Sequence, residues 1–104
     1  MFTFVETPLF TRLVTEYLSD EEYLDLQAML AENPQAGAVI RGSGGIRKLR
    51  WALKGSGKRG GLRVVYYFQA PKAEIWMLTL YPKNVAESIP ANILRKILKE
   101  MEDV

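Results

Sequence analysis

In the first third of the chain, apolar side chains recur three and four residues apart, which is the spacing of an amphipathic helix. They are Leu9, Leu13, Tyr17 and Leu18 in one segment and Tyr23, Leu26, Met29 and Leu30 in a second. Residues 7–8 (Thr-Pro) and 19–22 (Ser-Asp-Glu-Glu) carry helix-start signals. Residues 33–34 (Asn-Pro) end the second segment, because the position before a proline disfavours helix. The pattern predicts two short antiparallel helices after a short strand at residues 2–4.

Beyond residue 45, helical spacing is replaced by alternation. An extended chain over residues 46–54 places Ile46, Lys48, Arg50, Ala52 and Lys54 on one side and Arg47, Leu49, Trp51 and Leu53 on the other. The second side is mostly apolar and is predicted to face the core. The lysine and arginine side chains of the first side are therefore predicted to face solvent.

Three further segments complete the predicted fold. Residues 62–68 and 75–81 are rich in branched and aromatic side chains and predict two buried strands, joined by a tight connection at residues 70–73. Residues 89–101 have isoleucine or methionine at every fourth position and predict a terminal amphipathic helix. The order β-α-α-β-β-β-α indicates an α+β fold: two N-terminal helices packed on a mainly antiparallel sheet, with a C-terminal helix. Without a repeat or linker, residues 1–104 are predicted to form a single domain.

The composition limits the chemistry that this domain can perform. The chain has no cysteine and no histidine, which excludes disulfides, thiolate nucleophiles and the commonest general base and metal ligand. Catalysis would therefore use Lys, Arg, Tyr, Ser, Thr, Asp or Glu, and we expect no metal and no cofactor. No long apolar run and no signal-like N-terminus is present, so we expect a soluble, cytoplasmic protein without a membrane segment.

The net charge of +2 conceals a strong asymmetry along the chain. Residues 1–33 have a net charge of −6, residues 34–72 of +9 and residues 73–104 of −1. The middle segment contains no acidic residue. A segment of this charge inside a small domain attracts polyanions and speeds their capture, whereas the acidic first third is unsuited to contact them.

Two glycine-rich loops lie in this basic segment. Residues 42–45 (Gly-Ser-Gly-Gly) precede a strand and lack the pattern of a nucleotide-binding loop, so we interpret them as a flexible lead-in. Residues 54–61 are long for a hairpin loop and contain Lys54, Lys58 and Arg59. They form either a solvated hairpin tip or an arm that contacts phosphates, and the excess of positive charge favours the arm.

Basic residues also lie on the predicted strands. Arg63 begins the strand predicted at residues 62–68. If that strand pairs with the one predicted at residues 46–54, Arg63 meets Lys48 and Arg50 on one face of the sheet. Such a face is suited to bind a phosphodiester and to neutralise its developing charge. The alternative is an ordinary solvated face. Lys83 and Asn84 follow the last strand and either extend this surface or form a polar turn.

Four aromatic residues are assigned by their neighbours. Trp51 and Trp76 lie among apolar residues and are predicted to belong to the core. Tyr66 and Tyr67 point to opposite faces of one strand. At least one of these tyrosines is therefore expected in the core, and the other is available to stack on a base.

Three runs of sequence form a combined pattern: residues 45–50 (GIRKLR), 57–67 (GKRGGLRVVYY) and 78–84 (LTLYPKN). Together they resemble the RelE/HigB family of bacterial toxins, and the HigB-type branch most closely. The predicted order of strands and helices fits the same family. The resemblance implies a RelE-like fold and the toxin component of a type II toxin–antitoxin system, which cleaves mRNA on the translating ribosome.

The resemblance also implies a mechanism in which the ribose 2′-hydroxyl attacks the adjacent phosphorus and basic side chains stabilise the resulting charge, without a metal. The matching residues expected to be catalytic are Arg63, Lys48, Lys58, Lys83 and Tyr81, and those expected to bind RNA are Arg47, Arg50, Lys54, Arg59 and Asn84. Arg63 is expected to clamp the scissile phosphate. Crowding by other cations helps a lysine to lose its proton, so Lys48 or Lys58 is the expected acid or base, with Tyr81 as another candidate. Some members have a tyrosine in the final helix, where this chain has none.

The partners implied by the resemblance are a cognate antitoxin, expected to be of helix-turn-helix type and encoded adjacently, the ribosome and mRNA. Operator DNA is expected to bind only through the antitoxin. Two other functions stay open from the residues alone: a non-catalytic module that binds nucleic acid or protein, and a toxin of the same fold that targets DNA gyrase. The dense positive charge of the predicted sheet favours RNA.

Overall fold

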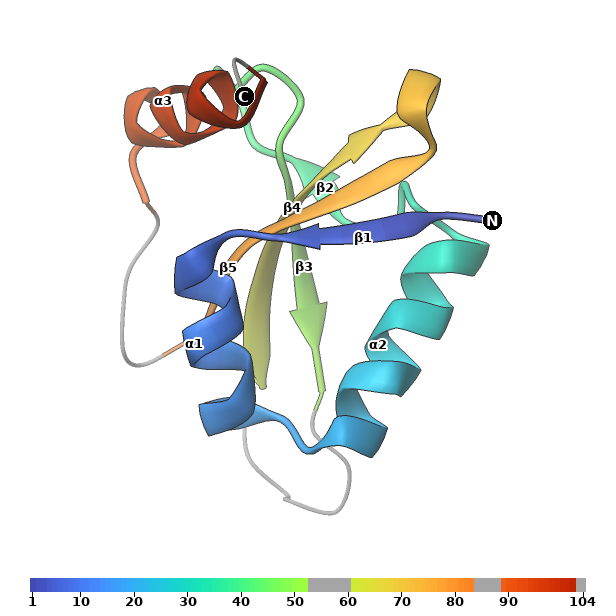
Figure 1. Cartoon of the computed structure of the whole chain (residues 1–104). Helices are drawn as coiled ribbons and strands as arrows, with labels where there is room; N and C mark the ends of the chain where they lie inside the picture. Colours follow the sequence, from blue (N-terminus) through green and yellow to red (C-terminus); the bar gives the residue numbers. More distant parts are fainter. Residues whose placement is uncertain (53–60, 84–88, 103–104) are drawn as a thin grey trace.

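The computed structural model describes residues 1–52, 61–83 and 89–102 of the chain (Figure 1). Its elements are β1 (Thr3–Glu6), α1 (Pro8–Tyr17), α2 (Asp20–Glu32), β2 (Ala38–Val39), β3 (Arg47–Trp51), β4 (Leu62–Gln69), the 3-10 turn η1 (Ala70–Lys72), β5 (Glu74–Pro82) and α3 (Ala91–Glu102). The predicted α+β order is confirmed. The short strand β2 is an addition that the sequence pattern did not predict.

The five strands form one sheet in the order β1-β5-β4-β3-β2. Only β1 runs parallel to its neighbour, and the other pairs are antiparallel. Residues of β4 alternate between two cores: Val64 and Tyr66 pack with α1 and α2, and Val65 packs with α3. The two N-terminal helices therefore cover one face of the sheet and the C-terminal helix covers part of the other (Figure 1).

Local signals fix the starts of both N-terminal helices, as predicted. The Thr7 hydroxyl accepts a hydrogen bond from the Phe10 amide at 3.0 Å and donates one to the Leu78 carbonyl at 2.8 Å. The start of α1 is thereby tied to β5. At the start of α2, Ser19 and Glu22 form a reciprocal capping box with distances of 2.8 and 3.1 Å.

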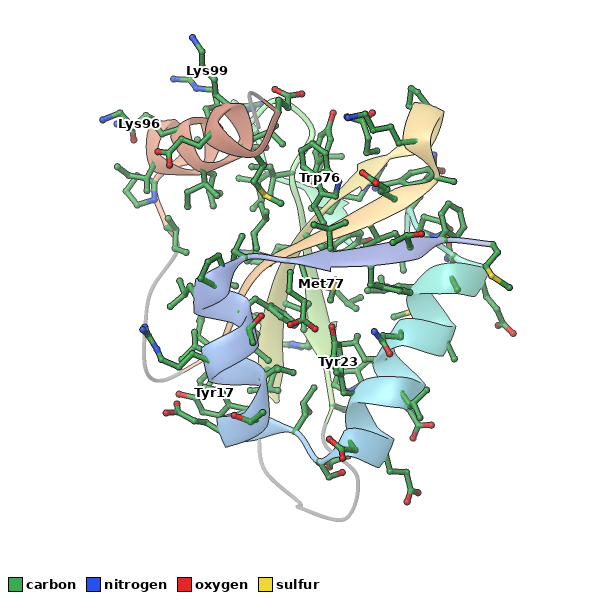
Figure 2. The ribbon with its side chains drawn as sticks, in the orientation of Figure 1. Tyr17, Tyr23, Trp76, Met77, Lys96 and Lys99 are labelled. Atoms are coloured by element: carbon green, nitrogen blue, oxygen red, sulfur yellow. The ribbon has the colours of Figure 1, made fainter. Side chains whose placement is uncertain are left out.

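One carboxylate joins the first three elements of the chain. Glu6 at the end of β1 accepts hydrogen bonds of 2.6 Å from Thr11 of α1 and from Tyr23 of α2. Tyr23 projects from α2 toward the sheet (Figure 2). Burial, and then the hydrogen bond and charge of Glu6, raise the pKa of the Tyr23 hydroxyl well above its ordinary value.

Tyr66 attaches the segment after α2 to the centre of the sheet. Its side chain is fully buried, and its hydroxyl donates to the Pro34 carbonyl at 2.7 Å and accepts from the Gly37 amide at 2.9 Å. Burial raises the pKa of this hydroxyl. Arg47 supports the same segment, because its guanidinium donates to the carbonyls of Gln35 and Gly37 at 3.2 and 2.7 Å.

Residues 42–45 form a closed loop, which differs from the predicted flexible lead-in. Ser43 is completely buried, and its hydroxyl donates to the Ile40 carbonyl at 2.6 Å and accepts from the Ile46 amide at 3.0 Å. The Ile40 amide donates to the Ile46 carbonyl at 2.8 Å. The flanking glycines have positive φ angles, which lets the chain turn tightly around the serine.

The C-terminal helix confirms the predicted amphipathic pattern. Leu94 and Leu98 are buried against the sheet, Ile97 and Met101 pack beside them, and Ile93 is 41% exposed. No helix in the described ranges is long and apolar enough to cross a membrane.

We predict that Tyr66→Phe destabilises the protein without changing its fold. The substitution leaves the Gly37 amide and the Pro34 carbonyl without their buried partner, which costs about 1–3 kcal/mol of unfolding free energy. Urea denaturation measures this loss. Tyr17→Phe is the control, because Tyr17 packs against the same core while no hydrogen bond joins its hydroxyl to another described residue. Equal losses in both variants would contradict the prediction.

We also predict that the fold weakens at high pH. Burial raises the pKa of Tyr23 and Tyr66 in the folded state, so above about pH 10 the unfolded chain binds fewer protons than the folded one. The stabilisation is complete below the ordinary tyrosine pKa and is lost as the pH rises through the folded values. Urea midpoints should fall between pH 8 and about pH 11, and should fall less in Tyr23→Phe. An equal fall in both proteins would refute the role of Tyr23.

Candidate nucleic-acid interface

Three polar side chains form a row across the three central strands of the sheet, one residue from the end that these strands share. Arg50 of β3 lies opposite Arg63 of β4, and Arg63 lies opposite Tyr81 of β5. Neighbouring strands are about 4.8 Å apart, so the three backbone positions span roughly 10 Å. We call Arg50, Arg63 and Tyr81 the basic row.

Lys48 lies on the same face, two residues along β3 from Arg50. It pairs with Val65, which in turn pairs with Thr79. Val65 is 1% exposed and, like Tyr81 of the basic row, belongs to the core beneath α3. Neither row contains a carboxylate.

The register therefore brings Lys48, Arg50 and Arg63 to one face, as the alternation along the strands predicts. Arg50 is exposed, whereas Lys48 and Arg63 are half-buried and each has an interaction partner within the chain. Guanidinium groups at directly opposed positions repel one another, and an anion bound between them relieves this repulsion. The arrangement is suited to hold a phosphate.

Tyr81 adds a proton donor to the two arginines. Its side chain is 8% exposed; burial raises the pKa of its hydroxyl, and the charge of Arg63 opposes part of that rise. The phenol therefore keeps its proton at neutral pH. In this state it can donate a hydrogen bond or a proton to an oxygen atom, but it cannot act as a base.

A β-bulge gives Tyr81 its place in the row. Val65 lies opposite Thr79 and Tyr66 lies opposite Met77, so Leu78 has no opposite residue. Strict alternation from Met77 would direct Tyr81 toward α1 and α2. The extra residue instead turns Thr79 and Tyr81 to the face of Arg63. The sequence pattern did not predict this position for Thr79. The signal available in the sequence was a polar residue within an otherwise apolar strand.

Two of the predicted residues lie elsewhere in the structure. Arg47 is on the opposite face, where it binds backbone carbonyls after α2. Tyr67 is half-buried on the α3 side, and its ring packs against Trp76 with ring centroids 5.5 Å apart. Neither side chain joins the basic row, and their proposed contacts with RNA or a base stay predictions.

The remaining predicted residues extend beyond the strands. Lys83 is exposed directly after β5, so it follows the basic row by two positions. Lys54, Lys58, Arg59 and Asn84 lie outside the described residues. Within the described ranges, no cluster of three Asp, Glu, His or Cys side chains is placed to hold a metal ion.

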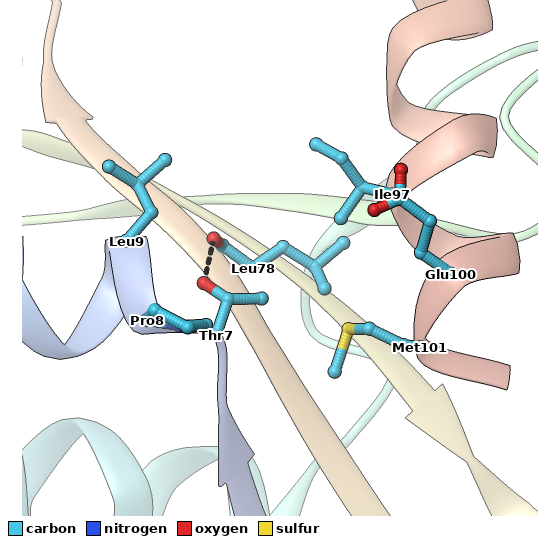
Figure 3. Close-up of a pocket in the computed structure, with 7 residues that line it drawn as sticks. All are labelled: Thr7, Pro8, Leu9, Leu78, Ile97, Glu100 and Met101. Atoms are coloured by element: carbon cyan, nitrogen blue, oxygen red, sulfur yellow. Dashed lines mark hydrogen bonds between the residues drawn. The ribbon is translucent and has the colours of Figure 1, made fainter. Parts of the chain in front are cut away.

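A groove of about 370 Å³ lies apart from the basic row, between the start of α1 and α3 (Figure 3). It is lined by Thr7, Pro8, Leu9, Leu78, Ile97, Glu100 and Met101. The Thr7 hydroxyl already donates a hydrogen bond to the Leu78 carbonyl, and among the described residues Glu100 is the only charged one in the lining. The groove therefore lacks the converging polar groups of a catalytic site.

Comparisons with known proteins identify the fold. No family model matches the sequence. The intact RelBE toxin–antitoxin complex of E. coli contains a chain with a TM-score of 0.60 and 18% identity, and the match covers 85% of this chain and 100% of that one. The isolated E. coli RelE toxin has a TM-score of 0.57 and 17% identity, and the match covers 97% of this chain and 99% of that one. The RelE–RelB complex of Pyrococcus horikoshii OT3 contains a chain with a TM-score of 0.54 and 17% identity, and the match covers 82% of this chain and 98% of that one. The chain thus has the RelE-like toxin fold.

Proposed function

We propose that the protein is the toxin component of a type II toxin–antitoxin system and cleaves mRNA on the translating ribosome. The observation that carries the proposal is the basic row, in which Arg63 stands between a second arginine and a protonated tyrosine. The RelE-like fold and the sequence motifs typical of the HigB-type branch support it.

In the proposed reaction, the ribose 2′-oxygen forms a bond to the adjacent phosphorus while the bond from phosphorus to the 5′-oxygen breaks. A base removes the proton of the 2′-hydroxyl, and an acid supplies a proton to the departing 5′-oxygen. The products are a 2′,3′-cyclic phosphate and a 5′-hydroxyl, so atoms and charges balance without another reactant. The extra negative charge on the phosphate is the feature that the protein must stabilise.

The residues of the row divide these tasks. Arg63 clamps the scissile phosphate, because its planar guanidinium donates to two oxygens at once. Arg50 and Lys48 hold the flanking backbone. Tyr81 protonates the departing oxygen, since its raised pKa keeps it in the acid form. The base is Lys48 or Lys58, and Lys83 adds a further positive charge after the end of β5.

The proposal also specifies partners and location. A cognate antitoxin of helix-turn-helix type, encoded adjacently, covers the basic face or locks α3, and operator DNA binds only through it. The RelE proteins of E. coli and of P. horikoshii have been crystallised in complex with RelB. The ribosomal target places the protein in the cytoplasm.

Primer extension on mRNA after induction of the protein separates the proposal from its alternatives. Cuts within translated codons support ribosome-dependent cleavage. Growth arrest with intact transcripts would exclude it and favour a gyrase-directed toxin. The absence of both effects would favour a non-catalytic binding module.

Arg63→Ala should abolish toxicity and reduce mRNA cleavage on the order of 10²–10³-fold, the effect of removing one donor to a transition-state oxyanion. Cleavage of mRNA by ribosomes with added purified protein measures the effect, and far-UV circular dichroism checks the fold. Arg12→Ala is the matched control, because Arg12 is exposed on α1, on the other face of the sheet. Retention of full toxicity by Arg63→Ala would remove Arg63 from the site.

Tyr81→Phe should slow cleavage by about 10²-fold or more while the protein still binds ribosomes, because the variant loses a proton donor but no positive charge. Single-turnover cleavage on saturating ribosomes measures the chemical step separately from binding. A substrate with a 5′-phosphorothiolate leaving group needs no proton and should restore the rate of the variant. Equal slowing with both substrates would assign Tyr81 a structural role.

A further inference from the structure

The first strand of the chain has one free edge. β1 is the last strand of the sheet, and among the described residues only β5 pairs with it. In Figure 1, β1 lies in front of the other strands, and none of the labelled helices crosses it. The amides of Thr3 and Thr7 donate to carbonyls on the β5 side at 3.0 and 3.1 Å. Because backbone groups alternate in direction along a strand, the amides and carbonyls of Phe2, Phe4 and Glu6 point away from β5.

This edge lacks the features that commonly prevent strands from pairing. Natural sheet edges are protected by lysine, by proline or by a β-bulge. β1 (Thr3–Glu6) contains neither of these residues, and its register with β5 is unbroken. Its first three residues are of types that favour strands. The charge of Glu6 is directed toward the helices, where Thr11 and Tyr23 donate hydrogen bonds to the carboxylate. The edge is therefore able to pair with another strand.

We propose that β1 pairs antiparallel with β1 of a second copy of this chain, about a two-fold axis that passes beside Phe4. Residues directly opposite each other in an antiparallel pair point to the same face of the sheet. In the register that satisfies this condition, Phe4 lies opposite Phe4 of the second copy, Thr3 lies opposite Val5, and Phe2 lies opposite Glu6. The outward amides and carbonyls of Phe2, Phe4 and Glu6 then all have partners.

The side chains of β1 are complementary to themselves in this register. Phe4 belongs to the face that α1 and α2 cover, so the two copies of Phe4 form an aromatic pair there. Val5 belongs to the α3 face and meets Thr3, which is a second favourable cross-strand pair. Glu6 meets Phe2, so no two like charges are directly opposed. The edge itself therefore supplies a suitable partner strand.

The acidic residues of the first third of the chain permit this approach. Four of the seven acids in residues 1–33 lie in or beside the connection between α1 and α2; they are Glu16, Asp20, Glu21 and Glu22. Figure 1 shows this connection at the end of the helix pair that is remote from β1. Salt screens the repulsion that remains between two copies. Self-association is therefore expected to strengthen with ionic strength, whereas binding of phosphates weakens.

The geometry limits the assembly to a dimer. The opposite edge of the sheet, β2 (Ala38–Val39), has two residues and is too short for the same ladder. A two-fold interface uses β1 of both copies, so no further copy can add. The two five-stranded sheets become continuous, and both basic rows lie on one face of the combined sheet. The proposal does not rest on the proposed function.

Introduced cysteines test the register of the two strands. The chain has no cysteine, so a disulfide can form only between introduced residues. Thr3 and Val5 of two copies form a pair without mutual hydrogen bonds, whose Cα atoms are about 4.5 Å apart and within reach of a disulfide. Two copies of the same position are diagonal neighbours about 7–8 Å apart, which is too far. A mixture of Thr3→Cys and Val5→Cys, oxidised with glutathione disulfide, should give about 10-fold more covalent dimer than either variant alone.

A charge placed on the edge tests association without a covalent bond. A ladder of this length is a small interface, so the dimer should form reversibly as the protein concentration rises. In sedimentation velocity, the sedimentation coefficient of the original protein should rise from the monomer value toward the dimer value. Thr3→Lys should keep the monomer value, because a lysine on an edge strand opposes pairing. Ala28→Lys adds the same charge at an exposed position of α2 and should associate like the original protein. Far-UV circular dichroism checks the fold of each variant.

Equal yields of covalent dimer in the mixture and in the single variants would overturn the proposal, because random collision would then explain the disulfides. Sedimentation as a monomer at every concentration would overturn it as well. If the thiol of Thr3→Cys is protected from alkylation only when the cognate antitoxin is co-expressed, the edge belongs to that protein and self-pairing is excluded.

Discussion

The backbone ladder that joins β3, β4 and β5 is the interaction on which the rest of the molecule depends. Because side chains alternate along a strand, its register decides which residues enter each core and which cations meet. A shift of one residue in the register of β4 would turn Val64 and Val65 to the opposite faces of the sheet. It would also direct Arg63 into the core beneath α1 and α2. Burial of an unpaired guanidinium there is prohibitively unfavourable. The apolar residues therefore also hold the cations in place.

The two faces of the sheet are covered unequally, and this inequality creates the candidate site. Along β5, every residue from Ile75 to Tyr81 is buried, so the strand is enclosed on both sides. α3 packs on the part of the sheet that includes Val65, Trp76 and Tyr81. Arg50 on β3 remains exposed on the same face. The cations thus stand on a rigid floor, which is the arrangement that fixes charged groups before a ligand binds.

Acidic and basic residues are also divided between the two faces of the sheet. The acidic first third, with a net charge of −6, contains α1 and α2, which pack on the face opposite the basic row. The basic row belongs to the strands and lies on the other side of the sheet. A molecule with this distribution is oriented by the field of a polyanion before contact, since its acidic side is repelled while its basic side is attracted.

The sequence by itself determined the features that depend on near neighbours. The caps at Thr7 and Ser19 need only the next three residues, and the alternation of Lys48 and Arg50 needs only an extended strand. It therefore predicted the element order and the convergence of three cations on one face.

Features that depend on distant partners were decided only by the tertiary structure. The bulge at Leu78 follows from how β5 pairs with β4, and it brings Tyr81 to the row. Arg47 is drawn to the carbonyls of Gln35 and Gly37, which are set by the chain after α2. Burial of Ser43 converts a glycine-rich segment into a closed loop beside α3. Each outcome depends on which backbone groups need a buried partner, and residues far apart in the sequence supply those partners.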